Sequence, residues 1–197
     1  MSTLDSPQVI DPKSVSPRPT ILRYGLISGL VLVAYSMLGI ATGLATPESG
    51  VALWILYSVI SIVIAVLIMV LPIKKHRNED LGGYIAFGRA FSVAFFTALI
   101  AYTISIFFSF VYTSFIDPDY ASRAIEGMRG FYEMLGMTEE QIEVAIEQGK
   151  AQVEGVSVGK KLLSNVWTLL GGSAMGAILA LIIAAIMQRK PPVENAV

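Results

Sequence analysis

The segment SGVALWILYSVISIVIAVLIMVLPI, residues 49 to 73, contains no Asp, Glu, Lys, Arg or His. An α-helix rises ~1.5 Å per residue, so this segment is long enough to cross the ~30 Å hydrocarbon layer of a bilayer. Residues 24 to 47, 90 to 116 and 162 to 188 also lack these residue types. Hydrocarbon offers no partner to open backbone groups, and the runs lack the alternation of a barrel strand. The sequence therefore predicts an all-α, polytopic membrane protein with four transmembrane helices.

The rest of the chain divides around these helices. The spans are predicted at about 21–46, 50–73, 86–116 and 162–188. They form one membrane domain, residues 21–190, which includes an acidic helical segment at 117–161 between the third and fourth spans. Prolines recur among polar residues in 1–20, so this stretch is expected to be a disordered tail. Residues 191–197 form a short C-terminal tail.

The distribution of Lys and Arg predicts the orientation. Basic residues near the spans are retained on the cytoplasmic side during insertion. Nine of them lie in the N-terminal tail, the second connection, the start of the third span and the C-terminal end, against five in the 117–161 segment. We therefore expect both termini in the cytoplasm and the acidic segment in an extracytoplasmic position.

Composition excludes several classes of function. A net charge of −1 without a basic face argues against a nucleic-acid partner. The absence of cysteine excludes disulfides, thiolate metal sites and thiol catalysis, and one histidine, His76, cannot build a multi-histidine site. The spans carry no paired carboxylates and no nucleophile beside a base. We therefore expect no cofactor, no metal and no enzymatic activity.

Small residues indicate where helices approach one another. Lipid is as apolar as leucine, so membrane helices associate through close backbone contact, which favours small residues four apart. The candidates are Gly172, Gly176, Ala180 and Ala184 in the fourth span, and Gly25 and Gly29 in the first. Two alternatives stay open, packing inside one bundle and self-association. The expected partners are the lipid bilayer and either a second copy or another membrane protein.

The third span carries hydroxyl groups and one charge. Tyr102, Ser105 and Ser109 lie on one face of the predicted helix. They are expected to form hydrogen bonds between helices, and the alternative is a solvated pathway. Arg89 is expected to anchor the start of the span at lipid phosphates, with a substrate or lipid site as the alternative. His76, in the basic second connection, is expected to face water and anionic lipid.

The acidic segment contains two helix signals. Asp117, followed by proline, is a favourable start for a helix predicted over about 118–135. Thr138 and Gln141 have the spacing of a capping box, and a second helix should run to about Gln152. Both helices are amphipathic, so their apolar faces need a partner. They either pack on each other as a small cap, lie on the outer ends of the spans or on the membrane interface, or form an interaction surface for a partner.

Three short motifs resemble a known family. They are LGGYIAFGRAF at 81–91, FIDPD at 115–119 and MTEEQ at 137–141. Their order and spacing are similar to those of a bacterial family of four-span membrane proteins known as domain of unknown function 4199. The resemblance covers roughly residues 20–190 and implies an inner-membrane location in a bacterium. It implies no activity, cofactor or catalytic residue, because the family has none assigned.

These observations favour a protein that acts through contacts rather than through chemistry. We expect a non-enzymatic accessory or assembly factor of the membrane, with the acidic segment as its recognition surface. The alternative is a small permease or channel assembled from several copies, which the hydroxyl groups of the third span suggest.

Overall fold

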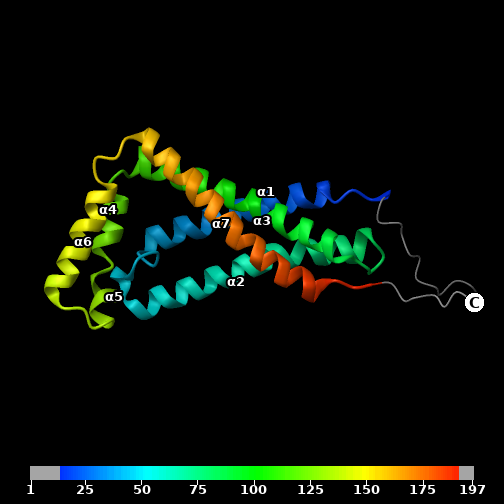
Figure 1. Ribbon diagram of the computed structural model, residues 1–197, viewed down its shortest axis with the longest axis horizontal. Coiled ribbons are helices and arrows are strands. Elements are labelled where there is room, and N and C mark those ends of the chain that lie inside the picture. Colours follow the sequence, from blue (N-terminus) through cyan, green and yellow to red (C-terminus); the bar gives the residue numbers. More distant parts are fainter. Residues whose placement is uncertain (1–13, 191–197) are drawn as a thin grey trace, which may run out of the picture. The chain divides into compact units, whose positions relative to one another are not determined.

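The computed structural model describes residues 14–190, and Figure 1 traces the chain through them. Its four long helices are α1 (Arg18–Thr42), α2 (Val51–Lys75), α3 (Phe87–Val111) and α7 (Val158–Met187). All four are long and apolar enough to cross a membrane. The described part of the chain contains no named strand. The prediction of an all-α, multi-pass membrane protein with four transmembrane helices is therefore confirmed.

The first helix begins earlier than predicted. The sequence predicts disorder for residues 1–20, of which 1–13 lie outside the described residues. From Arg18 the chain is already helical. Pro19 falls in the first turn, where its missing N–H costs no helical hydrogen bond and its ring favours the helical φ. The prediction of disorder is wrong for the last three residues of that stretch.

Two other helix ends also differ from the prediction. α1 ends at Thr42 rather than near 46, because Gly43 adopts a left-handed φ of +73°. α7 begins at Val158 rather than near 162, so Lys160 and Lys161 lie within the helix. Lysine is a good helix former, and a helix does not have to end where the hydrocarbon does.

Contacts within the chain divide it into two compact units. The first contains the chain up to Ser28, Ala65–Ala101 and the chain from Gly172 onward. The second contains Gly29–Ile64 and Tyr102–Gly171. Each of the four long helices contributes one part to each unit.

The first unit has a core of aliphatic and small side chains. Its buried members include Met69, Ile73, Leu81, Ile85, Ala90, Val93, Ala94, Ala180 and Ala184. The alanines allow close approach of helix backbones, which is the main source of association where no water is displaced. Beyond α7, Ile85 and Arg189 join their backbones through two hydrogen bonds of 2.9 Å.

The second unit contains an α1–α2 hairpin closed by the short turn η2 (Pro47–Ser49). The rings of Tyr35 and Tyr57 stack across this hairpin, with centroids 4.4 Å apart. The Tyr57 hydroxyl donates to the Tyr35 carbonyl at 3.1 Å, and the Tyr35 hydroxyl donates to the Tyr57 carbonyl. Gly39 leaves room for this arrangement, because a Cβ there would collide with the Tyr57 ring.

Three short helices follow α3 in the second unit. They are α4 (Tyr120–Glu126), α5 (Arg129–Met134) and α6 (Glu139–Val153), and we call residues 117–157 the connecting segment. The prediction of one helix over 118–135 is wrong, since the helix breaks at Gly127. A Cβ at Gly127 would lie 3.3 Å from the Cβ of Thr46, so the chain passes close to the α1–α2 turn at this point.

Candidate functional site

A buried histidine organises one end of the first unit. His76 opens the π-helical turn η3 (His76–Asp80), which continues α2, and its side chain is 0% exposed. Its Nδ1 lies 2.7 Å from Oδ2 of Asp80, and its Nε2 lies 3.0 Å from Nε of Arg89. The imidazole therefore sits between a carboxylate and a guanidinium.

The partners of His76 determine its tautomer. A guanidinium only donates hydrogen bonds, so Nε2 of His76 must be the acceptor from Arg89. The proton is then on Nδ1, which donates to Asp80. This assignment follows from the hydrogen-bond network. His76 is a neutral imidazole held by one cation and one anion.

Asp80 receives donors from two helices. Its Oδ2 accepts from the hydroxyl of Thr20 at 3.1 Å as well as from His76, and its Oδ1 accepts from Nζ of Lys75 at 2.7 Å. The Nη2 group of the same Arg89 side chain donates to the carbonyl of Val15. We call Thr20, Lys75, His76, Asp80 and Arg89 the polar cluster. It ties the start of α1, the end of α2 and the start of α3 together.

The geometry of the polar cluster suits a structural role. A histidine beside a carboxylate is a familiar arrangement for proton transfer. In this cluster both ring nitrogens of His76 are engaged by protein groups, and the ring is fully buried. No substrate can reach a ring nitrogen without breaking the bond to Arg89 or Asp80. The cluster joins the ends of three helices.

The prediction that His76 faces water and lipid is wrong. The basic connection does not leave the helix after α2 but continues it as a π-helical turn, which carries His76 inward. The spacing of His76 and Asp80, four residues apart, was the available signal. Arg89 was expected to bind lipid phosphate, and the structure places its guanidinium on His76 and Val15. Its contact with head groups stays a prediction.

The small residues expected at helix contacts have different surroundings. In the first unit, a Cβ added to Gly25 would lie 2.9 Å from Ile100 of α3, and Ala180 and Ala184 are completely buried. A Cβ added to Gly176 would meet no heavy atom within 4 Å. Gly172, one turn before Gly176 in the predicted row of small residues, is partly exposed. The row of small residues on α7 is therefore packed at Ala180 and Ala184, whereas no other described helix contacts it at Gly176.

In the second unit, the expected contact residues lie on α1 and α3. A Cβ added to Gly29 would lie 2.5 Å from Cδ1 of Ile104, so α1 and α3 touch there. Tyr102 and Ser105 are half-buried and Ser109 is exposed. Among the hydrogen bonds of the described residues, none joins these three side chains to another helix. α1 and α2 are instead joined by the hydrogen bonds of Tyr35 and Tyr57, which the sequence did not single out.

The connecting segment packs its apolar faces internally. Ile142 and Ile146 of α6 are 1% and 2% exposed, and Gly149 lies against Ile125 of α4. The ring of Phe131 in α5 meets Trp54 of α2 edge to face, with centroids 5.2 Å apart. Of the predicted alternatives, the structure therefore shows these faces packed partly on each other and, at Phe131, on α2, while Leu135 is 59% exposed.

Ion pairs join the helices of the connecting segment. Arg129 binds Glu139 and, at 2.9 Å, Glu143, and hydrogen bonding to Glu143 raises the pKa of the Arg129 guanidinium. Lys150 binds Glu126, and this bond lowers the pKa of Glu126 and raises that of Lys150. These pairs are exposed to solvent, so each contributes little to stability and is sensitive to salt.

The residues predicted to cap helices do not all occupy N-cap positions. Thr138 and Gln141 form the capping box at the start of α6: Gln141 N–H donates to the Thr138 hydroxyl at 3.3 Å, and Thr138 N–H donates to Gln141 Oε1 at 2.9 Å. Asp117 is not the N-cap residue of α4, which begins after Asp119. The Asp117 carboxylate binds Arg123, which lowers the pKa of Asp117, and a hydrogen bond from the backbone of Tyr120 contributes to this lowering.

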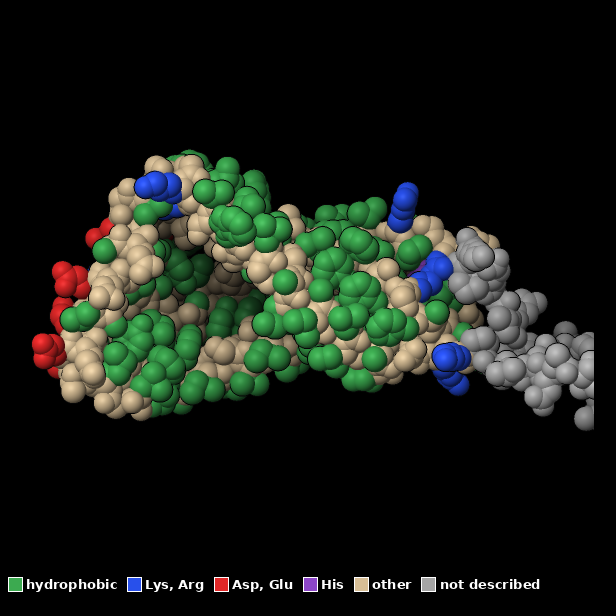
Figure 2. Space-filling model, viewed as in Figure 1, with side chains coloured by type: hydrophobic (Ala, Val, Ile, Leu, Met, Phe, Trp, Pro, Cys, Tyr) green, Lys and Arg blue, Asp and Glu red, His purple; other side chains and the backbone are tan. Residues whose placement is uncertain are grey.

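Carboxylates cover the outer edge of the connecting segment. Figure 2 shows Asp and Glu side chains gathered along this edge, whereas hydrophobic side chains cover much of the long helices. Glu140 and Glu147 lie on the solvent face of α6, and Val144 between them is 47% exposed. No three His, Asp or Glu side chains within residues 14–190 gather as metal ligands. The edge is therefore an acidic protein surface with one apolar side chain at its centre.

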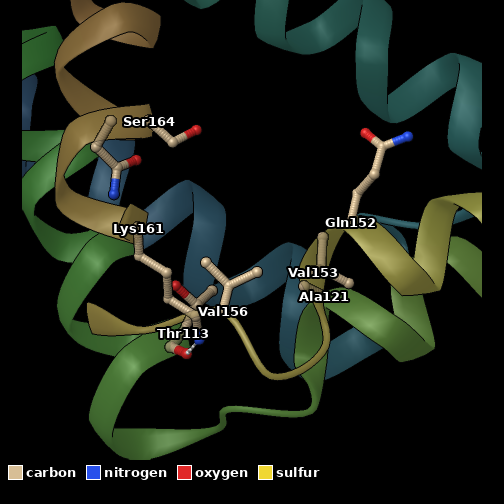
Figure 3. Close-up of a pocket in the computed structure, with 8 residues that line it drawn as sticks. Thr113, Ala121, Gln152, Val153, Val156, Lys161 and Ser164 are labelled. Carbon is tan, nitrogen blue, oxygen red and sulfur yellow. Dashed lines mark hydrogen bonds between the residues drawn. The ribbon is translucent and has the colours of Figure 1, made fainter. Parts of the chain in front are cut away.

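A pocket of about 210 Å³ lies within the second unit, where the connecting segment meets α7 (Figure 3). Its lining residues are Thr113, Ala121, Gln152, Val153, Val156, Lys161, Ser164 and Asn165. Lys161 extends across one side and donates to the carbonyl of Thr113 at 2.8 Å. The pocket was not predicted from the sequence, although Lys161, Ser164 and Asn165 have the spacing of one helix face.

Comparison with known proteins gives one match. A family model described as "Protein of unknown function (DUF4199)" matches residues 23–189. No curated protein and no solved structure matches the chain. The match covers α2, α3, α7 and the connecting segment, together with α1 from Arg23 onward.

Proposed function

Because the chain belongs to the DUF4199 family of proteins of unknown function, we propose its role from its own surfaces. It acts as an accessory or assembly factor of a bacterial inner membrane, and the acidic edge of the connecting segment recognises a basic segment of another membrane protein. Its contribution is binding rather than catalysis.

This proposal rests on the exposed face of α6. The apolar side of this helix is buried against α4 and α5, so that side is not available to a partner. The residues that α6 presents to solvent include Glu140, Val144 and Glu147. Opposite charges across an interface steer association and select the partner, while an apolar side chain at the centre adds affinity. A basic segment with an apolar residue fits this face.

The proposal is tested by photo-crosslinking in cells from position 144, where Val144 is exposed. We expect one defined protein adduct with the wild-type surface, and at least a fivefold loss of it in the E140Q/E147Q variant. The matched control is E79Q/E133Q, which removes the same number of charges from exposed positions outside α6 and should keep the adduct. A crosslink that is equally strong in both double variants would contradict recognition by the acidic edge.

Orientation is part of the same proposal. Nine Lys and Arg residues lie on the side of the termini and five on the side of the connecting segment, which supports cytoplasmic termini and an extracytoplasmic connecting segment. The chain has no native cysteine, so single cysteines at Asn78 and Glu140 give a clean test. A membrane-impermeant thiol reagent added to intact cells should label position 140 and not position 78. The reverse pattern would overturn the orientation and the choice of partner.

A second candidate is a small permease formed by several copies. The polar side chains of Thr113, Ser164 and Asn165 around the pocket are the observation that favours it. Reconstituted protein that forms a defined oligomer and carries a solute across vesicles would support this candidate over the accessory role.

A further inference from the structure

The pocket at the start of α7 is rich in hydrogen-bond donors and positively charged. Lys161 is the charged side chain among the eight described residues that line it, and no carboxylate is among them. An ammonium group has three donors, and the bond to Thr113 uses one of them. The amides of Asn165 and Gln152 and the hydroxyl of Ser164 supply further donors. This chemistry suits an oxyanion.

The dimensions of the pocket limit what enters it. Sites for whole small molecules are typically ~300–1,000 Å³, and this pocket has about 210 Å³. It is therefore large enough for a charged head group and too small for a larger ligand to be enclosed entirely. The remainder of such a ligand has to lie outside the pocket.

The part of α7 that lines the pocket also carries an apolar surface. Leu162, Leu163 and Val166 are exposed on the same turns as Lys161 and Ser164, and Trp167 is 68% exposed. In a membrane protein, exposed apolar side chains of a spanning helix contact acyl chains, and Trp marks the level of the head groups. The pocket therefore lies where a lipid presents its charge, next to a surface suited to its acyl chains.

We propose that this pocket binds the oxyanion head group of an amphiphile, held by Lys161 with Ser164 and Asn165, while the acyl chain lies along the exposed apolar face of α7. The shared chemistry is a phosphate or carboxylate group. A membrane phospholipid and a soluble phosphate are its two sources. This proposal does not rest on the acidic edge, because none of Glu140, Val144 and Glu147 lines the pocket.

Lys161 has a neighbour that serves as a matched control. Lys160 is exposed, carries the same charge and does not line the pocket. General attraction of basic residues to anionic lipid affects both lysines in a similar way. A specific head-group site depends on Lys161 alone.

The experiment measures retained lipid by native mass spectrometry and thermal stability of the full chain, with added phosphatidylglycerol, phosphatidylcholine or inorganic phosphate. We expect phosphatidylglycerol to bind the wild-type protein, K161Q to weaken this binding about tenfold or more, and K160Q to change it less than threefold. K161R keeps the charge and should retain most of the binding. S164A/N165A should weaken it even if K161Q does not fold.

The comparison of ligands and variants decides whether the oxyanion site exists and where its ligand comes from. If inorganic phosphate protects the wild-type protein as well as phosphatidylglycerol does, and K161Q removes that protection, the oxyanion site stands and its ligand comes from solution. If K161Q and K160Q weaken binding equally, or if phosphatidylcholine binds as well as phosphatidylglycerol, the proposal is overturned.

Discussion

Arg89 donates a hydrogen bond from Nε to Nε2 of His76 at 3.0 Å, and this bond joins the start of α3 to the end of α2. Because an arginine never accepts, the contact requires His76 to be neutral on that nitrogen. The second ring nitrogen binds Asp80, which also holds Lys75 and Thr20. One buried imidazole therefore connects groups that lie 13 and 4 residues from it along the chain.

Replacement of His76 should destabilise the protein. H76A removes two hydrogen bonds to charged groups and opens a cavity, so we expect the free energy of unfolding to fall by about 2–4 kcal/mol. Thermal unfolding in detergent measures the change. N78A, at an exposed position in the same turn, should stay within about 0.5 kcal/mol of the wild type. Equal stability of the two variants would mean that the polar cluster does not hold the fold.

The tautomer of His76 is directly observable. The chain has a single histidine, so one pair of imidazole nitrogen signals in ¹⁵N NMR belongs to it. At pH 7 we expect Nδ1 to carry the proton and Nε2 to be unprotonated. R89K removes the planar donor and should shift the Nε2 signal. A proton on Nε2 in the wild-type protein would show that the bond from Arg89 does not form in the membrane.

The ion pair between Glu126 and Lys150 predicts how pH acts on the connecting segment. The pKa of Glu126 is lowered by Lys150, so its stabilising contribution is present above its unfolded value of ~4.3 and is lost as pH falls through the lower folded value. The pKa of Lys150 is raised, so its contribution is present below ~10.4 and is lost as pH rises beyond that value. The packing of the connecting segment on α2 should therefore not change between about pH 4.3 and pH 10.4.

Trp54 provides the measurement for this pH dependence, because it packs on Phe131 of the connecting segment. Trp167 is replaced by Phe so that Trp54 is the only fluorescent tryptophan, and the emission of Trp54 should then change below about pH 4. E126Q removes the pair at every pH, so its emission at pH 7 should shift by a small amount toward the acid-state value, as expected for an exposed pair, whereas E133Q should titrate like the parent. If E126Q leaves the emission at pH 7 unchanged, the ion pair does not contribute to docking.

The α1–α3 contact should be sensitive to a single methyl group. G29A places a Cβ 2.5 Å from Ile104, so Ile104 or the helix must shift, at a cost of about 1–3 kcal/mol. G171A, in α7, meets no atom within 4 Å and should be neutral or slightly stabilising. Thermal unfolding of both variants under one detergent condition gives the comparison. A neutral G29A would mean that the two helices separate at this point.

Local features of the sequence predicted the elements well. The four uncharged runs correspond to α1, α2, α3 and α7, and the Thr138–Gln141 spacing corresponds to the capping box of α6. Each of these depends on residues close together in the chain. The break at Gly127 was missed, and the close approach of Thr46 at this point was not predictable either, because Thr46 lies far away in the sequence.

The sequence by itself determined that the chain is helical and crosses a membrane, because apolar length and charge distribution are sufficient to decide how a segment partitions into lipid. Only the tertiary structure decided that His76 is buried, that Lys161 faces a pocket and that Tyr35 stacks on Tyr57. Each of these depends on two or more helices meeting in a particular register, and the energies that select the register come from packing and hydrogen bonds between distant residues.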